Sequence, residues 1–388
     1  MKHNETDCDT RLTWRRFPSC FQPFLTWLSG KPLPEELPWR IGIWHHFASA
    51  ILSVLIGLIL SVFFCHYGIT IPLIAVAWVI EVHGMRKLRT GIMHFAAHQN
   101  FTRNRKHDNI IGTIISIFLC SESHASYTSS HVGDHHGVGH MSMNDPTVQF
   151  LILRFGLRGG MARKECWNRV WMKLLSPTFY IKTLYNRIAT HFNKTTFLYR
   201  TIFVSYHIIF TFLFIILTGM TGWIVGWLIP ISIIYTASAA LRLCSRHTFP
   251  KKGCCYTHKE TICSFTDGIF IGDPAPNSDG ILLWIYWWLK LIFFHIPSRC
   301  LILPMDGPAH DHHHRAPRHP KWFIYPFIRR DEALMCNPSW PPYTETWGVW
   351  KMIDKVFTTL EKADPLVYHP DAKFVRVPRA ELSAALYD

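Results

Sequence analysis

The sequence predicts an all-α integral membrane protein, with four transmembrane helices in two hairpins and a cytoplasmic helical cap. Three observations predict it. Four apolar stretches reach or approach the length of about 20 residues that spans a bilayer. The two short connections between them carry no Lys or Arg, and three histidine-rich motifs flank apolar segments. Only 17% of the 388 residues are charged, against about 25% in globular proteins.

The first hairpin is expected from two apolar stretches near the N-terminus. Residues 48–65 form a run without charge, followed by a turn at 66–68. The next stretch, 69–82, is short, but it reaches spanning length when it is extended to residues 67–85. We expect it to continue out of the membrane as one helix that carries the first histidine motif.

The second hairpin is expected over residues 201–218 and 223–244, with a glycine-containing turn at 219–222. Two further apolar segments are predicted to lie in the membrane interface. Residues 109–120 are too few to span, and residues 281–303 are interrupted by charged residues and rich in tryptophan.

Charge predicts the topology. The turns at 66–68 and 219–222 contain no Lys or Arg, so the basic flanking regions are assigned to the cytoplasm by the positive-inside rule. This places both termini and all three histidine motifs on the cytoplasmic side. The polar N-terminus has no apolar region of the kind that precedes a signal-peptidase site. We therefore expect an N-terminal arm (1–47), a membrane domain (48–320) and a cytoplasmic C-terminal tail (321–388).

The net charge of +14 does not indicate a nucleic-acid-binding protein. The basic residues lie beside apolar spans, where they favour contact with anionic lipid head groups. The eleven cysteines contain no CxxC pair, and we interpret them as reduced thiols.

Histidine motifs carry the chemistry. Imidazoles one helical turn apart share a face and are common ligands for iron, copper and zinc. Each motif alone has a structural alternative, such as a packing pair, a solvated loop or a chance histidine-rich tract. Three of them on one side of the membrane favour a metal centre. The ligand candidates are His94 and His98 (HxxxH), His131, His135 and His136 (HxxxHH), and His310, His313 and His314 (HxxHH).

Eight imidazoles exceed the three or so protein ligands of a catalytic zinc ion and predict two metal ions. The motifs are nearly free of acids, unlike the Glu-rich sites of soluble di-iron bundles, and no HExxH motif is present. Additional ligand candidates are His140, His312 and His319, whereas His124, His207 and His258 are interpreted as packing or surface residues. Candidates for carboxylates that orient the imidazoles are Glu81, Asp134, Asp145 and Asp311.

The order of these motifs resembles the membrane fatty acid desaturase family over roughly residues 45–320. The resemblance includes a single histidine after the second hairpin and the pair Asp145-Pro146 after the second motif. It implies a di-iron centre that uses O2 on an unactivated C–H bond, with the eight histidines and His247 as ligands. His247 follows Arg242-Leu-Cys-Ser-Arg246, whereas the family often has Asn or Glu upstream of this histidine.

The resemblance implies O2-dependent desaturation of a long acyl chain of a fatty acid or lipid, in the bacterial cytoplasmic membrane rather than the endoplasmic reticulum. Hydroxylases, ketolases and alkene-forming decarboxylases belong to the same superfamily and stay open. A zinc-dependent membrane lipid hydrolase and a metal carrier are alternatives from other classes. The tail has no HPGG haem motif (residues 369–371 read HPD) and no iron–sulfur cysteine spacing. A separate electron donor of ferredoxin, rubredoxin or cytochrome b5 type is therefore expected.

Overall fold

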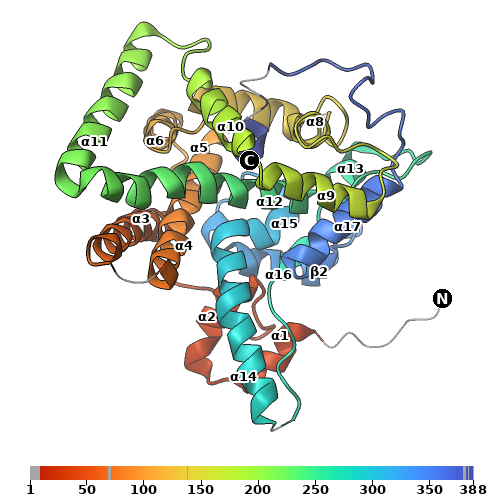
Figure 1. Cartoon of the computed structure of the whole chain (residues 1–388). Coiled ribbons are helices and arrows are strands. Elements are labelled where there is room, and N and C mark those ends of the chain that lie inside the picture. The colour runs from red at the N-terminus through yellow and green to blue at the C-terminus, as the bar shows by residue number, and fades with distance from the viewer. Residues whose placement is uncertain are drawn as a thin grey trace.

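The computed structural model describes residues 9–68, 71–137, 139–278, 280–378, 382 and 384–387, and the side chain of His258 lies outside this description. The chain is mostly helical (67%), as predicted. Figure 1 shows long helices extending outward from a central group of shorter ones, with α15 (His310–Arg315) near the middle.

The first hairpin consists of α3 (Ile43–His66) and α4 (Ile71–Lys87). Two glycines let its helices approach closely, because a Cβ on Gly57 would lie 2.4 Å from the backbone nitrogen of Glu81. A Cβ on Gly84 would lie 2.6 Å from the carbonyl oxygen of Ala50. As expected, α4 continues through a π-helical segment, η3 (Leu88–Met93), into α5 (His94–Ala97), which carries the first histidine motif.

The second hairpin runs through α11 (Phe197–Trp223), η5 (Ile224–Leu228), η6 (Pro230–Ile234) and α12 (Tyr235–Arg246). Its 50 residues would extend about 75 Å as one straight helix, more than twice the thickness of a hydrocarbon core. Gly219, with φ 74° and ψ 169°, breaks the helix within the predicted turn. The sharp bend at the end of α11 is visible in Figure 1.

Among the residues that the structure describes, three helical segments are long and apolar enough to cross a membrane, namely Ile43–His66, Phe197–Arg246 and Ile281–Ile302. The third comprises α14 (Ile281–Lys290), η7 (Leu291–His295) and η8 (Ser298–Ile302). The length and hydropathy of this segment are thus sufficient for a span, whereas the sequence analysis predicted an interfacial helix. The interfacial placement stays a prediction, and so does the topology with four spans. The segment packs on the N-terminal arm through Trp287 and Trp14, whose ring centroids lie 5.9 Å apart.

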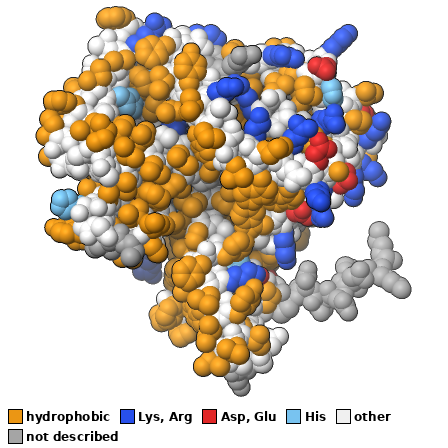
Figure 2. Space-filling view, in the orientation of Figure 1, with side chains coloured by type: hydrophobic (Ala, Val, Ile, Leu, Met, Phe, Trp, Pro, Cys, Tyr) orange, Lys and Arg blue, Asp and Glu red, His pale blue; other side chains and the backbone are white. Residues whose placement is uncertain are grey.

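Shorter helices surround the histidine motifs. They are α2 (Gln22–Ser29), α6 (Arg105–Phe118), α7 (His124–Thr128), η4 (Ser129–His135), α8 (Pro146–Leu153), α9 (Arg163–Leu174), α10 (Pro177–Thr190), α13 (His258–Ser264), α16 (Tyr325–Met335) and α17 (Val349–Glu361). Figure 2 shows charged side chains gathered on the side of α9 and α17, whereas apolar side chains dominate over α3, α11 and α14. This division suits a protein with one face in lipid and another in water.

The structure also contains a short parallel pair of strands that the sequence did not predict. β1 (Gly268–Phe270) pairs with β2 (Glu345–Trp347), and Ile269 faces Thr346 in the register. Three residues are too few to show the alternation that identifies a strand in a sequence. The pair joins residues 321–388 to the body of the protein, and Tyr387 stacks on Tyr235 of α12 with ring centroids 5.1 Å apart.

Candidate metal centre

All nine predicted ligands meet at one place, although they come from four separate parts of the chain. They are supplied by the continuation of α4, by η4 and the residue after it, by the residue after α12, and by α15. Eight of the side chains are less than 5% exposed, and His136 is partly buried. Burial of so many imidazoles together indicates a shared partner, because each would otherwise lose its hydrogen bonds to water.

The first group contains His94, His98, His131 and His313. One ring nitrogen from each lies within 4.8 Å of the others. Nε2 of His94 is 2.9 Å from Nε2 of His313, and Nε2 of His98 is 3.1 Å from Nε2 of His131. Nitrogens that share one ion at about 2.1 Å stand about 3.0–3.4 Å apart. The spacing therefore suits a common metal ion.

The second group contains His135, His247, His310 and His314, again within 4.8 Å. Nε2 of His310 lies 3.1 Å from Nε2 of His314. His136 lies between the groups: its Nε2 is 3.3 Å from Nε2 of His313, and its ring stacks on His314 at 4.6 Å. Two adjacent positions for an ion result.

Two of the motifs divide their histidines between the groups. In the second motif His131 belongs to the first group and His135 to the second. In the third motif His313 belongs to the first group, whereas its neighbour His314 belongs to the second. Adjacent residues on a helix point about 100° apart, so one short helix can supply both positions.

Hydrogen bonds to Nδ1 orient several of the rings. Nδ1 of His135 lies 3.0 Å from Oδ2 of Asp145. The other carboxylate oxygen, Oδ1, caps α8 by accepting from the backbone N–H of Thr147 at 2.8 Å. Nδ1 of His94 lies 2.8 Å from the hydroxyl of Tyr127. Such contacts fix the tautomer that leaves Nε2 free for a metal. Sequence reasoning missed Tyr127, although it precedes His131 by four residues and so shares its helical face.

The second group fits a metal ion by a further observation. Nδ1 of His247 lies 3.0 Å from Oγ1 of Thr266. Nε2 of both His247 and His135 is buried and has no hydrogen-bond partner in the part of the chain that the structure describes. Buried ring nitrogens of this kind are costly unless something coordinates them, so their positions suit a metal ion.

The electrostatics of the cluster keep four of its imidazoles neutral. Burial, followed by the effect of neighbouring histidines, holds the pKa of His94, His310, His313 and His314 well below the usual value. Arg246 adds to this lowering of the pKa for His94 and His310. Burial alone would raise the pKa of Asp145, but His135 and His140 outweigh it and hold that pKa well below its usual range. Neutral imidazoles have the lone pairs that metal ligands need.

Asp145 is the predicted carboxylate that contacts the cluster. Glu81 does not: it lies thirteen residues before His94 on a continuous helix, roughly 20 Å away, and packs in the α3–α4 hairpin. Asp311 instead forms a two-pronged ion pair with Arg329, with Nη2 2.7 Å from Oδ2. The side chain of Asp134 is exposed. Glu81 and Asp311 were predicted to orient the imidazoles because they are near the motifs in sequence. This prediction was wrong, since a residue that is close in the chain can point away from the site.

Among the additional histidines, His140 joins the cluster and His312 does not. His140, His135 and Asp145 form a further group of possible ligands within 4.8 Å, and Nε2 of His140 is buried without a partner among the described residues. Nδ1 of His312 instead lies 3.0 Å from Glu332, and His319 packs beside His312.

Two histidines predicted to have packing or surface roles lie away from the cluster. His207 contacts the carbonyl of Ile117 at 3.0 Å, and the ring of His124 packs on Gly112.

Arg246 adds a cation beside the second group. Its Nε donates to Nε2 of His310 at 3.2 Å. Because the same nitrogen is the ligand candidate, metal binding at His310 requires this guanidinium to move or to turn to another acceptor. Sequence reasoning identified Arg246 only as context for His247.

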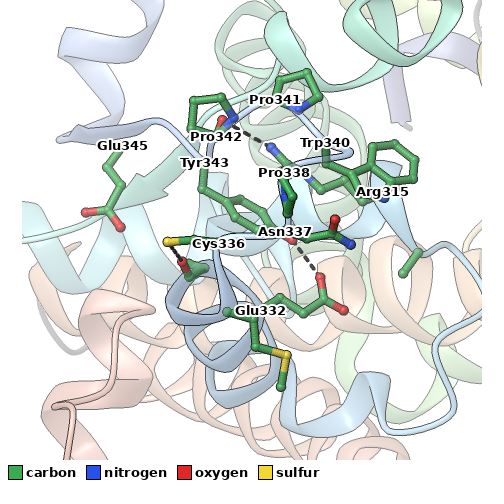
Figure 3. Close-up of a pocket in the computed structure, with 13 residues that line it drawn as sticks. Arg315, Glu332, Cys336, Asn337, Pro338, Trp340, Pro341, Pro342, Tyr343 and Glu345 are labelled. Atoms are coloured by element: carbon green, nitrogen blue, oxygen red, sulfur yellow. Dashed lines mark hydrogen bonds between the residues drawn. The ribbon is translucent and has the colours of Figure 1, made fainter.

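A cavity of about 780 Å³ lies behind the third motif but is not the metal centre (Figure 3). Its wall includes Arg315, Glu332 and Tyr343, and none of the nine histidines lines it. The hydroxyl of Tyr343 donates to Glu332 at 2.8 Å, and Glu332 also contacts His312. The cavity thus borders the outer side of α15, whereas the ligand nitrogens gather on its inner side.

The site is therefore a buried histidine cluster that can hold metal ions. No protein-family model matches the chain, and a search of curated proteins finds no match.

Proposed function

We propose that this protein is a membrane oxidoreductase that uses O2 to desaturate a long acyl chain at a centre of two iron ions. The observation that carries the proposal is the pair of adjacent four-histidine groups. A hydrolase with one catalytic zinc ion would use about three of these ligands and leave most of the buried imidazoles without a role. Iron, when bound, supplies redox chemistry with O2 that zinc does not.

The side chains around the cluster would exclude water from the reaction. Phe95 stacks on Trp322 with ring centroids 4.1 Å apart and meets His313 edge-on at 5.6 Å. Tyr127 is 1% exposed and stacks on His131. A dry site protects a reactive species from side reactions with solvent, and apolar walls suit an acyl chain.

The reaction balances with a donor of electrons. Conversion of two adjacent methylene groups to a double bond consumes O2, two electrons and two protons and yields two molecules of water. The electrons would come from a separate ferredoxin, rubredoxin or cytochrome b5-type protein, as expected from the sequence. The acyl substrate would enter from the bilayer, since α3 and α11 expose apolar side chains such as Leu55, Ile59, Phe212 and Ile216.

Metal analysis of the purified chain together with product analysis tests the proposal. We expect two iron ions per chain, and a new monounsaturated acyl chain in the lipids of expressing cells by mass spectrometry. One zinc ion per chain would overturn the proposal in favour of a lipid hydrolase, and variable metal content would favour a carrier. Two iron ions per chain with only hydroxylated, ketone or terminal-alkene products would support the di-iron centre but overturn desaturation as the reaction. Enzymes that form such products belong to the same superfamily.

A further inference from the structure

A second cavity, of about 560 Å³, lies between the N-terminal arm and the adjoining ends of α3 and α4. Pro23 and Trp27 of α2 line it. Among the residues that the structure places around the cavity, none is Asp or Glu. Six of them are basic, namely Arg40, His45, His46, His83, Lys87 and Arg299. An excess of basic groups with no acid among them suits an anionic ligand.

Arg299 is the most deeply buried of the three Lys and Arg residues around the cavity, at 1% exposed. Its Nε donates to the carbonyl of Trp27 at 2.7 Å, and its Nη2 donates to the carbonyl of Met305 at 2.9 Å and to the hydroxyl of Tyr325. Its Nη1 is buried without a hydrogen-bond partner among the residues described. A buried guanidinium nitrogen of this kind is a donor available to a ligand.

Lys87 is the second cation and is 9% exposed. Its Nζ donates to Oγ of Ser49 at 2.5 Å, and within the described ranges no carboxylate pairs with it. Two buried cations that line one cavity repel each other and pay a desolvation cost that no acid of the cavity wall offsets. An anionic ligand bound in the cavity would reduce both the repulsion between the two cations and their desolvation cost.

The remaining walls and the position suit the head of a lipid. Trp27, Trp39 and Ile41 contribute apolar surface. Ser49 belongs to α3 and Arg299 to Ile281–Ile302, two of the segments able to span a membrane, and Lys87 is the last residue of α4. Tryptophan and basic residues together at the end of apolar helices mark the head-group region of a bilayer.

The cavity is also close to the histidine cluster. Met305 lines it and packs on Gly91, where a Cβ would lie 2.7 Å from Cγ of Met305. Gly91 precedes His94 by three residues, and the rise from Lys87 to His94 is about 10 Å along a helix. A ligand held in the cavity would therefore lie near the metal centre.

We propose that this cavity binds the anionic head group of a long-chain amphiphile, with Nζ of Lys87 and Nη1 of Arg299 as the cationic donors. The head group is a carboxylate if the ligand is a free fatty acid and a phosphate if it is a bilayer phospholipid. Identification of a bound fatty acid as the substrate rests on the proposed function, whereas the binding site itself does not.

Equilibrium binding to the full-length protein in a non-ionic detergent tests the site with three probes: palmitate, hexadecanol and dioctanoyl phosphatidate. We expect saturable binding of palmitate and at least about tenfold weaker binding of the neutral alcohol, because it lacks the charge-assisted hydrogen bonds. Tighter binding of phosphatidate than of palmitate would support the same site with a phospholipid as its ligand. Equal affinity for hexadecanol and palmitate would overturn the proposal.

Variants locate the binding. Lys87→Met should weaken palmitate binding about tenfold or more, and Lys87→Arg should keep it within about threefold. Lys106→Met is the matched control, since Lys106 is exposed on α6 and does not line the cavity. Arg40→Met, at an exposed cavity residue whose replacement spares the core, should weaken binding about threefold.

Unchanged palmitate binding in both Lys87→Met and Arg40→Met would refute the site. The assay requires no turnover and no metal. A chain that binds palmitate but contains no iron would contradict the proposed function and support the binding site, so the two failures are distinguishable.

Discussion

Nδ1 of His135 lies 3.1 Å and 3.0 Å from the two carboxylate oxygens of Asp145, and both side chains are buried. The carboxylate accepts the Nδ1 proton and so directs the Nε2 lone pair of His135 into the second histidine group. The same carboxylate caps α8 and accepts from the backbone N–H of Met141 at 3.0 Å. One residue thereby fixes both a ligand and the loop between the second motif and α8.

The Asp145 contact predicts a metal-affinity phenotype. Asp145→Asn should lower metal affinity about 10–100-fold, because the amide can present its N–H₂ group to Nδ1 and no longer enforces the tautomer. Asn is a good helix cap, so the fold should persist. Metal content after dialysis against graded chelator measures the effect. Asp354→Asn is the control, since Asp354 is a partly exposed partner of Arg163, at 2.8 Å. Equal metal retention by both variants would contradict the role of Asp145.

Two neighbouring histidines in the third motif should behave differently. His313→Ala removes a ligand of the first group and should lower bound metal by at least one ion per chain and abolish activity. His312→Ala should retain both ions, because His312 contacts Glu332 and belongs to neither group. Elemental analysis of both purified variants measures the number of metal ions bound per chain. Loss of metal from His312→Ala to the same extent would show that the division of the motif is wrong.

Replacement of His135 should separate the metal centre from membrane insertion. His135→Ala should abolish activity while the chain still inserts, since insertion depends on the apolar segments. His207→Ala should keep most activity, because His207 lies on α11 and contacts only the carbonyl of Ile117 among the hydrogen bonds found for it. Product analysis with membrane fractionation measures both. Near-normal turnover of the His135 variant would refute the assignment of the ligands.

The topology prediction is testable by thiol labelling from outside intact cells. After replacement by serine of the cysteines that are exposed in the described part of the chain (20, 254, 255 and 336), Tyr67→Cys and Met220→Cys should react with an impermeant maleimide. Both positions are more than half exposed and lie at the turns that lack Lys and Arg. Cys336, restored alone, should react only after permeabilisation. Labelling of Cys336 in intact cells would contradict a cytoplasmic C-terminal region.

Asp306 predicts a pH dependence of stability. Burial raises its pKa to about 6, and Arg242 only partly opposes this. The unfolded value is about 3.9, so the folded state binds the proton more tightly and loses stability as the pH rises from about 4 to about 6. The loss is on the order of 2–3 kcal/mol. Asp306→Asn does not titrate, so its melting temperature relative to wild type should rise with pH over this window. Exposed Asp331→Asn should show no such trend. A constant difference for Asp306→Asn would contradict the raised pKa.

Local patterns made the helices and the ligands predictable from the sequence. Apolar runs identified α3 and α11. The turn predicted at residues 219–222 contains Gly219, where the structure breaks the helix. The spacing of His94 and His98, and of His131 and His135, places each pair on one helical face. These features depend on residues a few positions apart, so the chain's own periodicity determines them.

The sequence was less informative where function depends on contacts between distant residues. Glu81 and Asp311 were near the motifs in sequence, yet one packs in a hairpin and the other pairs with Arg329. The strands β1 and β2 were missed because three residues show no pattern.

By itself, the sequence determined which imidazoles are candidates and which segments are apolar enough to enter a membrane. The tertiary structure alone decided how His313 and His314 divide between two groups, and which carboxylate orients His135. It also placed Lys87 and Arg299 around one cavity. The physical reason is separation along the chain: His94 and His313 are 219 residues apart, and only packing of the helices brings their Nε2 atoms to 2.9 Å.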